Sequence, residues 1–298
     1  MTVFGVHAGL QQTEMDDLRA LWRRVEDLGF GWISIWDHFY SATGGDEPHC
    51  HEAVATHAAL ACDTSSVRCG SLVYSVSYRH PAVLANAICT IDHLSGGRAE
   101  LGLGSGWSEI EYKAYGIPFP RAGVRLDQLE EAIQCVRGLL RNEVTDFDGE
   151  WFTMTNARCE PKPLQAALPI WVGGGGEKRT LKIAAQWADG WNVAYVAPET
   201  FAHKRAVLHQ HCDSVGRNPA EIRTAVNVGV AWTDESLHTQ FGPMAEFVRP
   251  GVLTGSDEEV IDRIGQYVEA GADQVNLALR APFDTEALDR FAAALKLK

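Results

Sequence analysis

The segment Gln274-Val-Asn-Leu-Ala-Leu279, followed by Thr285-Glu-Ala-Leu-Asp-Arg-Phe-Ala-Ala-Ala-Leu295, decides the fold of this 298-residue chain. The first part has the apolar residues of a buried strand, and the second has the spacing of an amphipathic helix. Together they form the last of eight strand-and-helix units. A closing helix after the eighth strand favours a single-domain parallel (β/α)8 barrel, an α/β fold that routinely takes about 250 residues. An open doubly wound sheet is the alternative.

Upstream of this segment, short apolar runs alternate with segments of helical spacing. The other seven strands are expected at Val3–His7, Trp32–Trp36, Val67–Val73, Ala99–Leu103, Ile170–Val172, Gly190–Val193 and Arg223–Val230. The first helix shows the pattern, with apolar residues on one face at Leu18, Leu21, Trp22 and Val25. We expect a capping box of Thr13 and Asp16 to begin this helix and Gly29 to end it.

Two segments, residues 142–168 and 231–256, are longer than ordinary connections. The first contains the hairpin-like Phe147-Asp-Gly-Glu-Trp-Phe152, and the second has few periodic apolar positions. Both are insertions in the barrel pattern. They are either tolerated surface insertions or a pair of lids over the C-terminal rim of the barrel.

Composition excludes several classes of partner. The chain has 26 Lys and Arg against 39 Asp and Glu, a net charge of −13, so nucleic acid and anionic membranes are poor partners. No run reaches the roughly 20 apolar residues that span a bilayer, and residues 1–10 lack the pattern of a secretory signal. The seven cysteines are dispersed without a C-x-x-C pair, which predicts free thiols and a cytoplasmic location.

The strongest local motif is Trp171-Val-Gly-Gly-Gly-Gly-Glu-Lys-Arg-Thr180. Four glycines follow a strand and open a helix, so their N–H groups can converge on an anion with help from the helix dipole. Lys178 and Arg179 add positive charge in an acidic protein. The motif therefore predicts a phosphate site, although a tight turn that needs positive φ is the simpler alternative.

Other motifs are weaker. Asp37-His38 follows the second strand, where a histidine beside a carboxylate suits proton transfer or a hydrogen bond to a cofactor, or is simply structural. Gly102-Leu-Gly-Ser-Gly-Trp107 lacks the third glycine of a dinucleotide fingerprint. The clusters His49-Cys50-His51 and His209 to Cys212 lack the spacing of a structural zinc site, so no metal is expected.

In combination, five stretches resemble the bacterial luciferase-like flavin and deazaflavin oxidoreductases, a barrel family, over essentially the whole chain. These are Ile35-Trp-Asp-His-Phe39, Tyr78-Arg-His-Pro81, Asp92-His-Leu-Ser-Gly-Gly-Arg98, Leu101-Gly-Leu-Gly-Ser-Gly-Trp107, and Gly173 to Thr180 continuing to Ala188-Asp-Gly-Trp-Asn192. The Asp-His pair and the long glycine loop are most similar to the branch that uses coenzyme F420, an 8-hydroxy-5-deazaflavin.

The resemblance implies a set of cofactor contacts. Those at the deazaflavin ring and its polar edge are Asp37, His38, Ser105 and Gly106. Those near its phosphate are Gly173, Gly174, Gly175, Gly176, Lys178 and Arg179.

The resemblance implies three further features around the ring. A non-proline cis peptide behind the ring falls at Ser71–Leu72 when one counts back from Pro81. Tyr74 stands where relatives often have Thr and is a further ring contact. The Glu that some relatives have just past strand four falls at Glu109, to within two residues.

Three functions are therefore considered. The first is an oxidoreductase that moves a hydride between the deazaflavin and a small organic substrate. In it, His38 would be the proton donor or acceptor, with its imidazole oriented by Asp37, and Glu109 is a second catalytic candidate. The second is an FMN-dependent luciferase-like monooxygenase, which needs the reduced flavin and oxygen. The third is a cofactor-binding protein without catalysis. Beyond a small-molecule substrate, a second copy of the chain, giving a homodimer, is the partner considered.

Overall fold

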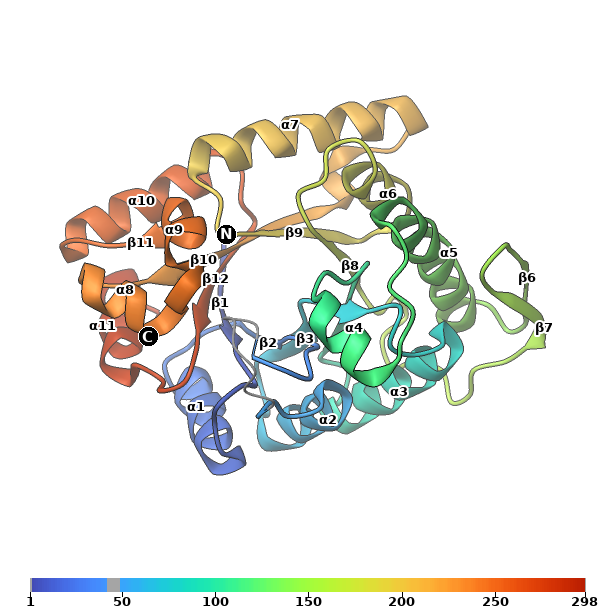
Figure 1. Cartoon of the computed structure of the whole chain (residues 1–298), viewed down its shortest axis with the longest axis horizontal. Coiled ribbons are helices and arrows are strands. Elements are labelled where there is room, and N and C mark those ends of the chain that lie inside the picture. The colour runs from blue at the N-terminus through green and yellow to red at the C-terminus, as the bar shows by residue number, and fades with distance from the viewer. Residues whose placement is uncertain (1, 42–48, 298) are drawn as a thin grey trace.

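Parallel pairing between the first and last long strands closes the sheet into a barrel. In the computed structural model, which describes residues 2–41 and 49–297, Val3 to Ala8 pair in register with Gln274 to Leu279. The barrel strands, in spatial order, are β1 (Val3–Ala8), β2 (Trp32–Ile35), β3 (Arg68–Ser71), β5 (Ala99–Gly104), β8 (Ile170–Gly173), β9 (Gly190–Ala194), β10 (Arg223–Val230) and β12 (Gln274–Leu279). Each predicted strand is confirmed, and so is the barrel (Figure 1).

The predicted third strand, Val67–Val73, is divided. β3 ends at Ser71, and the chain pairs with β5 again only as β4 (Tyr74–Ser75). Between them, the peptide bond Leu72–Val73 is cis.

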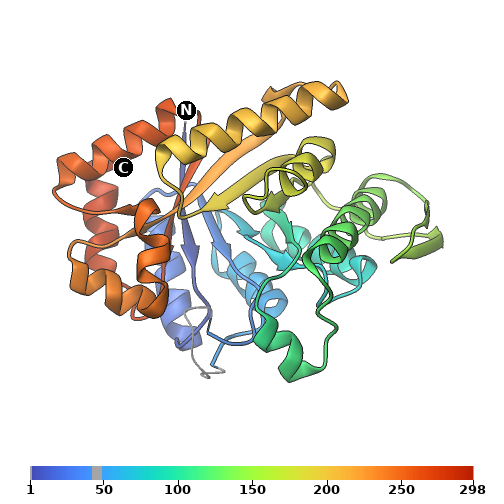
Figure 2. The same ribbon diagram turned by 45° about the horizontal axis from the view of Figure 1, so that its top comes forward.

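Helices surround the barrel, and the closing helix is confirmed with its predicted bounds. They are α1 (Met15–Asp27), α2 (Ala53–Asp63), α3 (Pro81–Ser95), α4 (Glu109–Tyr115), α5 (Ala122–Arg141), α6 (Thr180–Trp187), α7 (Pro198–Val215), α8 (Asp234–Phe241), α9 (Ala245–Val248), α10 (Asp257–Glu269) and α11 (Thr285–Leu295). Figure 2 shows α4 at the end toward which the strand arrows point. None of the helices in the described part of the chain is both long and apolar enough to cross a membrane.

The start of α1 differs from the prediction, whereas its buried face does not. Leu18, Leu21, Trp22 and Val25 are all buried, as expected. The capping box is wrong, because the helix begins at Met15 behind Glu14 and no side chain caps it. The Thr13 hydroxyl instead donates to the carbonyl of Glu14 at 3.3 Å. Gly29 follows the helix at φ +85°, in the left-handed region that glycine allows.

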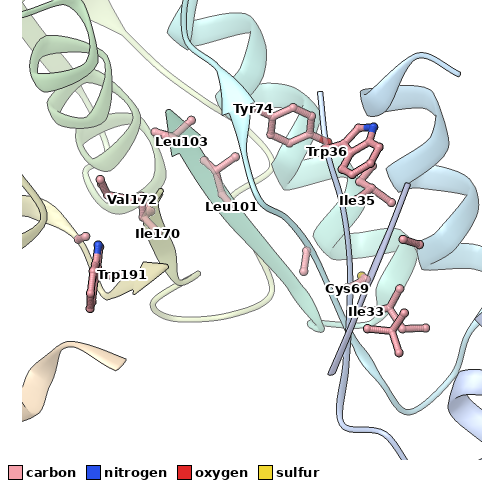
Figure 3. Packing of buried hydrophobic residues seen from close by; sticks show 14 of the residues in the cluster. Ile33, Ile35, Trp36, Cys69, Tyr74, Leu101, Leu103, Ile170, Val172 and Trp191 are labelled. Atoms are coloured by element: carbon pink, nitrogen blue, oxygen red, sulfur yellow. The ribbon is translucent and has the colours of Figure 1, made fainter. Parts of the chain in front are cut away.

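The main apolar core lies between the strands and the helices, and Figure 3 shows the part contributed by β2, β5 and β8. The floor of the barrel is different. There the buried carboxylate of Glu100 contacts Arg68, accepts from Arg223 at 2.8 Å and accepts from the indole of Trp171 at 2.5 Å. Gly190 makes room for that indole, since a Cβ there would lie 2.3 Å from a ring carbon.

The two long segments have different positions. Residues 142–168 include the hairpin of β6 (Thr145–Asp148) and β7 (Thr153–Ala157), which confirms the expected hairpin. Its tip rests on α5, because the Glu131 carboxylate accepts the N–H groups of residues 150–152. Figures 1 and 2 place it at the outer edge of the molecule, so the surface-insertion alternative holds for this segment and the rim-lid alternative does not.

Residues 231–256 instead fold over the C-terminal end of the barrel. They contain α8, α9 and the short β11 (Val252–Leu253), which pairs with β10. Ala231, Leu237, Phe241, Ala245, Val248 and Val252 form a small buried cluster of their own. The helices are short and joined by 3-10 turns, and for that reason the sequence shows little periodicity there.

Candidate active site

A cavity of about 610 Å³ opens at the carboxyl ends of the barrel strands. One arc of its wall follows β3, β5 and β8, and we call it the backbone arc because five of its residues are glycines. It comprises Leu72, Val73, Ser75, Tyr78, Gly104, Ser105, Gly106, Trp107, Gly173, Gly174 and Gly175. The other arc follows β9, β10, β12, β1 and β2 and presents larger side chains. These are His7, Trp36, Asp37, His38, Asn192, Tyr195, Asn227 and Arg280, with Met244, Phe247 and Val248 above them.

The backbone arc is shaped by the Leu72–Val73 peptide, which lines the cavity. The cis bond lies one residue later than the predicted Ser71–Leu72, because counting back from Pro81 fixes the loop and not the residue. Leu72 lines the cavity as expected. Ser71 does not, since its hydroxyl donates to the carbonyl of Gly102 at 3.2 Å and accepts from the N–H of Gly102 at 3.1 Å.

Glycine is required beside this peptide at two places. A Cβ on Gly104 would lie 2.4 Å from Val73, and one on Gly173 would lie 2.7 Å from it. Real Cβ atoms do not come so close, so the two glycines let the Val73 side chain pack against neighbouring strands. The wall therefore has no side chain at residues 104 and 173, which leaves a flat molecule room to approach there.

His38 is held by a carboxylate that the sequence analysis did not name. Its Nδ1 lies 2.7 Å from Glu111 Oε1, and the Glu111 side chain is fully buried. The other carboxylate oxygen, Oε2, accepts from the Tyr78 hydroxyl at 2.7 Å and from the Phe39 N–H at 3.2 Å. Burial acts to raise the pKa of Glu111, but the hydrogen bonds from His38, Tyr78 and Phe39 outweigh it and lower that pKa.

Glu109, the second catalytic candidate, faces away from the cavity. Its side chain is 55% exposed and pairs with Lys113 at 2.9 Å. Glu111 stands two residues later, on the buried side of α4. Residue 111 lies within the two-residue margin that the family resemblance left around Glu109, and it is buried beside Tyr112.

Asp37 has a different partner from the one expected of it. Its carboxylate forms a two-pronged ion pair with Arg79, at 2.6 and 3.0 Å, and accepts the N–H of Ser75 at 3.0 Å. Burial raises the pKa of Asp37, against the opposing effect of Arg79. The idea that Asp37 orients the His38 imidazole is therefore wrong, although both residues line the cavity as expected.

Tyr74 also lies elsewhere. Its side chain is buried, and its hydroxyl lies 2.9 Å from Nδ1 of His57 on α2. It is absent from the described cavity lining, so the structure does not bring this predicted ring contact to the site. Ser105 and Gly106 do line the cavity.

The glycine loop borders the cavity through Gly173, Gly174 and Gly175, with Thr180 at the start of α6. Gly174 has φ +123° and its N–H donates to the carbonyl of Asn192 at 2.9 Å. Among the described groups, none accepts from the N–H of Gly175 or Gly176. The loop thus offers the two donors that an anion at a helix N-terminus needs, although Gly176 is not part of the lining.

The predicted cations of this loop, Lys178 and Arg179, are not part of the described cavity lining. Lys178 is exposed, and Arg179 pairs with Asp127 at 2.6 Å on α5. A lysine from α7 lies closer, because the Lys204 ammonium donates to the Gly175 carbonyl at 2.8 Å and to Glu177 at 3.1 Å. No motif in the sequence connects residue 204 with this loop.

The side-chain arc of the cavity is polar and aromatic. His7 Nδ1 lies 2.8 Å from the Ser34 hydroxyl, and burial, together with Arg280 and His38, lowers the pKa of His7 to about 3. The Asn192 amide donates to Asn227 at 3.0 Å. Arg280 donates to the Tyr195 hydroxyl at 2.9 Å and lies over the ring of Phe241, with 4.4 Å to its centroid.

No metal centre is found in the part of the chain that the structure describes. No group of three or more His, Cys, Asp or Glu side chains there could hold an ion. His51 instead bonds the carbonyl of Thr13, and His211 that of Glu177.

Fold and cavity together define a (β/α)8 barrel with its ligand site at the carboxyl ends of the strands. The chain belongs to the luciferase-like monooxygenase family, whose model matches residues 1–241. It is 28% identical to a 5,10-methylenetetrahydromethanopterin reductase of Archaeoglobus fulgidus over 249 residues, covering 83% of this chain and 69% of that protein. With the first curated relatives, at 36% identity, the match spans 43% of this chain and 44% of their length, less than half of either.

Solved structures show the same fold. An F420-dependent secondary alcohol dehydrogenase in complex with an F420–acetone adduct matches with a TM-score of 0.89 and 21% identity, covering 99% of this chain and 98% of that one. A long-chain alkane monooxygenase matches with a TM-score of 0.81 and 15% identity, covering 99% and 91%.

Proposed function

We propose that this protein is an F420-dependent oxidoreductase acting on a small organic substrate. The observation that carries the proposal is His38 on the cavity wall, fixed at Nδ1 by the buried Glu111 and without a partner for Nε2 among the described residues. The names of similar proteins support the choice of cofactor. They include an F420-dependent glucose-6-phosphate dehydrogenase and an F420-dependent secondary alcohol dehydrogenase.

The residues fit the cofactor. The backbone arc, with its glycines at residues 104, 106 and 173–175, suits a flat ring. The N–H groups of Gly175 and Gly176, which have no acceptor within the described part of the chain, suit its phosphate. Asp37, Ser105 and Gly106 would lie along the edge of the ring. When bound, the deazaflavin supplies two-electron chemistry as a hydride at its C5.

His38 would hold or move the proton that accompanies the hydride. Because Glu111 is an acceptor, the His38 Nδ1 carries a hydrogen in this arrangement, and Nε2 is the nitrogen that faces substrate. Glu111 does not face the cavity lining, so we assign it a positioning role. Glu109 has no part in this proposal.

The partners and the setting follow from the same reasoning. The substrate is a small molecule, since the cavity has room for little more than a ring system and a compact second molecule. All seven cysteines are free, which supports a reducing, cytoplasmic setting. A homodimer remains a prediction.

The test is a side-by-side titration of the apoprotein with F420 and with FMN. We expect F420 to bind at least tenfold more tightly, a difference of about 1.4 kcal/mol. Equal or reversed affinities would move the chain to the FMN monooxygenase branch, whose fold it shares. Binding of F420 without turnover of any substrate in a broad screen would favour a cofactor carrier.

A further inference from the structure

Arg280 is a buried cation that has no carboxylate partner among the residues the structure describes. It is 8% exposed and lines the cavity from the end of β12. No acidic side chain forms an ion pair with it within residues 2–41 and 49–297, whereas the other cavity charge, Asp37, is paired with Arg79. Burying an unpaired charge is unfavourable, and a ligand anion is one partner that would offset this cost.

One donor group of the Arg280 guanidinium is left for a ligand. Nη1 donates to the Tyr195 hydroxyl at 2.9 Å, and Nε has no acceptor among the described residues but is itself buried, so a ligand does not reach it. No acceptor is found for Nη2 in the described chain. A carboxylate oxygen is the acceptor that a charged N–H donor of this kind favours.

The surroundings favour one negative charge with an apolar body. Aromatic rings lie against the guanidinium, with centroids at 4.4 Å for Phe241 and 5.0 Å for Trp36. The neighbouring His7 is neutral, because its pKa is about 3. Arg280 is the only lysine or arginine in the described lining, so a phosphate dianion would keep an unmatched charge.

Arg280 lies on a different part of the cavity wall from the proposed cofactor contacts. Arg280 follows β12 and neighbours His7 on β1, whereas the glycine wall follows β3, β5 and β8. We propose that Arg280 binds the carboxylate of a monoanionic substrate and that this contact selects the substrate class. The proposal rests on the proposed function for the location of the cofactor, but its test does not need turnover.

The experiment is calorimetric titration of the F420-loaded protein with benzoate, with benzamide as the uncharged match and phenyl phosphate as the dianion. Benzoate should bind at least tenfold more tightly than benzamide to the wild type. Arg280→Met, which keeps an apolar stem, should lose that preference, and Arg280→Lys should keep part of it, because a lysine supplies charge without the fork.

The outcomes are distinct. Equal binding of benzoate and benzamide to the wild type overturns the proposal, as does a benzoate affinity unchanged by Arg280→Met. Tighter binding of phenyl phosphate than of benzoate overturns the monoanion assignment. If Arg280→Met does not fold, the wild-type comparison and Arg280→Lys still decide. The same titrations on apoprotein separate the two proposals. If benzoate binds in an Arg280-dependent way but F420 does not bind at all, the carboxylate site is supported and the proposed F420-dependent function is refuted.

Discussion

Glu111 determines which nitrogen of the His38 imidazole is available to a ligand. Its Oε1 lies 2.7 Å from Nδ1, which leaves Nε2 for the cavity. The Tyr78 hydroxyl and the Phe39 N–H hold the other carboxylate oxygen in place. A buried carboxylate with three donors is thereby kept ionised and in one orientation, and the histidine it holds is ordered in turn.

We expect His38→Ala to leave F420 bound but to slow hydride transfer by about 10²–10⁴-fold, the usual contribution of a general acid or base. Cofactor affinity, melting temperature and single-turnover transfer, with a substrate found by screening, would be measured on the one variant. A parallel fall of affinity and rate would make His38 a ring contact only. Unchanged transfer at full occupancy would remove it from the mechanism.

Glu111→Gln should act through His38 rather than on substrate. We expect turnover to fall by about 10–100-fold and the pH profile of turnover to shift, because the imidazole loses its anionic partner. Glu109→Gln is the matched control, since Glu109 is exposed on the same helix, and it should change neither. Equal effects of the two variants would refute the positioning role.

At the scale of elements, the loop before α6 is held from α7. The Lys204 ammonium donates to the Gly175 carbonyl, whereas Lys178 on the loop itself is exposed. Lys204→Met should therefore weaken F420 binding about tenfold through loss of the loop anchor, and Lys178→Met should change it by less than about twofold. Titration of both variants with F420 measures the two effects. A larger loss of affinity in Lys178→Met than in Lys204→Met would show that the loop cation binds the phosphate.

The connection after α2 depends on a carboxylate of α1. Glu26 accepts the N–H groups of Ser65, Ser66 and Val67, and these bonds lower its pKa to about 2 against the effect of burial. A lowered pKa stabilises the fold above the ordinary value of 4.5, and the contribution is lost as pH falls toward 2.

Glu26→Gln should therefore destabilise the protein near pH 7 by about 1 kcal/mol, after allowance for the partial exposure of the group. Denaturant unfolding at pH 7 and at pH 3 measures the difference, which should shrink at the lower pH. A difference that grows on acidification would contradict the assignment.

What the sequence could predict at this scale depends on how local the signal is. The strands and α11 have continuous periodicity, so their positions were predictable. The partners of His38 and Gly175 come from residues 111 and 204, which the fold alone brings near. Asp37 and His38 are neighbours in sequence, but their side chains bind Arg79 and Glu111 respectively, a division that adjacency does not reveal.

At the scale of the whole molecule, Glu100 ties the floor of the barrel together. Its carboxylate on β5 contacts Arg68 of β3, Arg223 of β10 and Trp171 of β8. Glu100→Ala should cost about 3–5 kcal/mol of unfolding free energy, because it leaves two arginines without their buried partner. F420 affinity should change little, since the cavity lies at the opposite end of the strands. If the unfolding free energy measured by denaturant titration falls by less than about 1 kcal/mol, water replaces Glu100 as the partner of the two arginines and the prediction is wrong.

We propose that the cofactor lies against the backbone arc and the substrate against the side chains opposite it, and a crystal structure of the F420 complex tests this division most directly. We expect the deazaflavin ring to lie against Leu72 and Val73, its phosphate to bind the N–H groups of Gly175 and Gly176, and His38 and Arg280 to face the remaining space. A complex in which the phosphate binds Arg280, or in which the ring lies outside the barrel mouth, would contradict it.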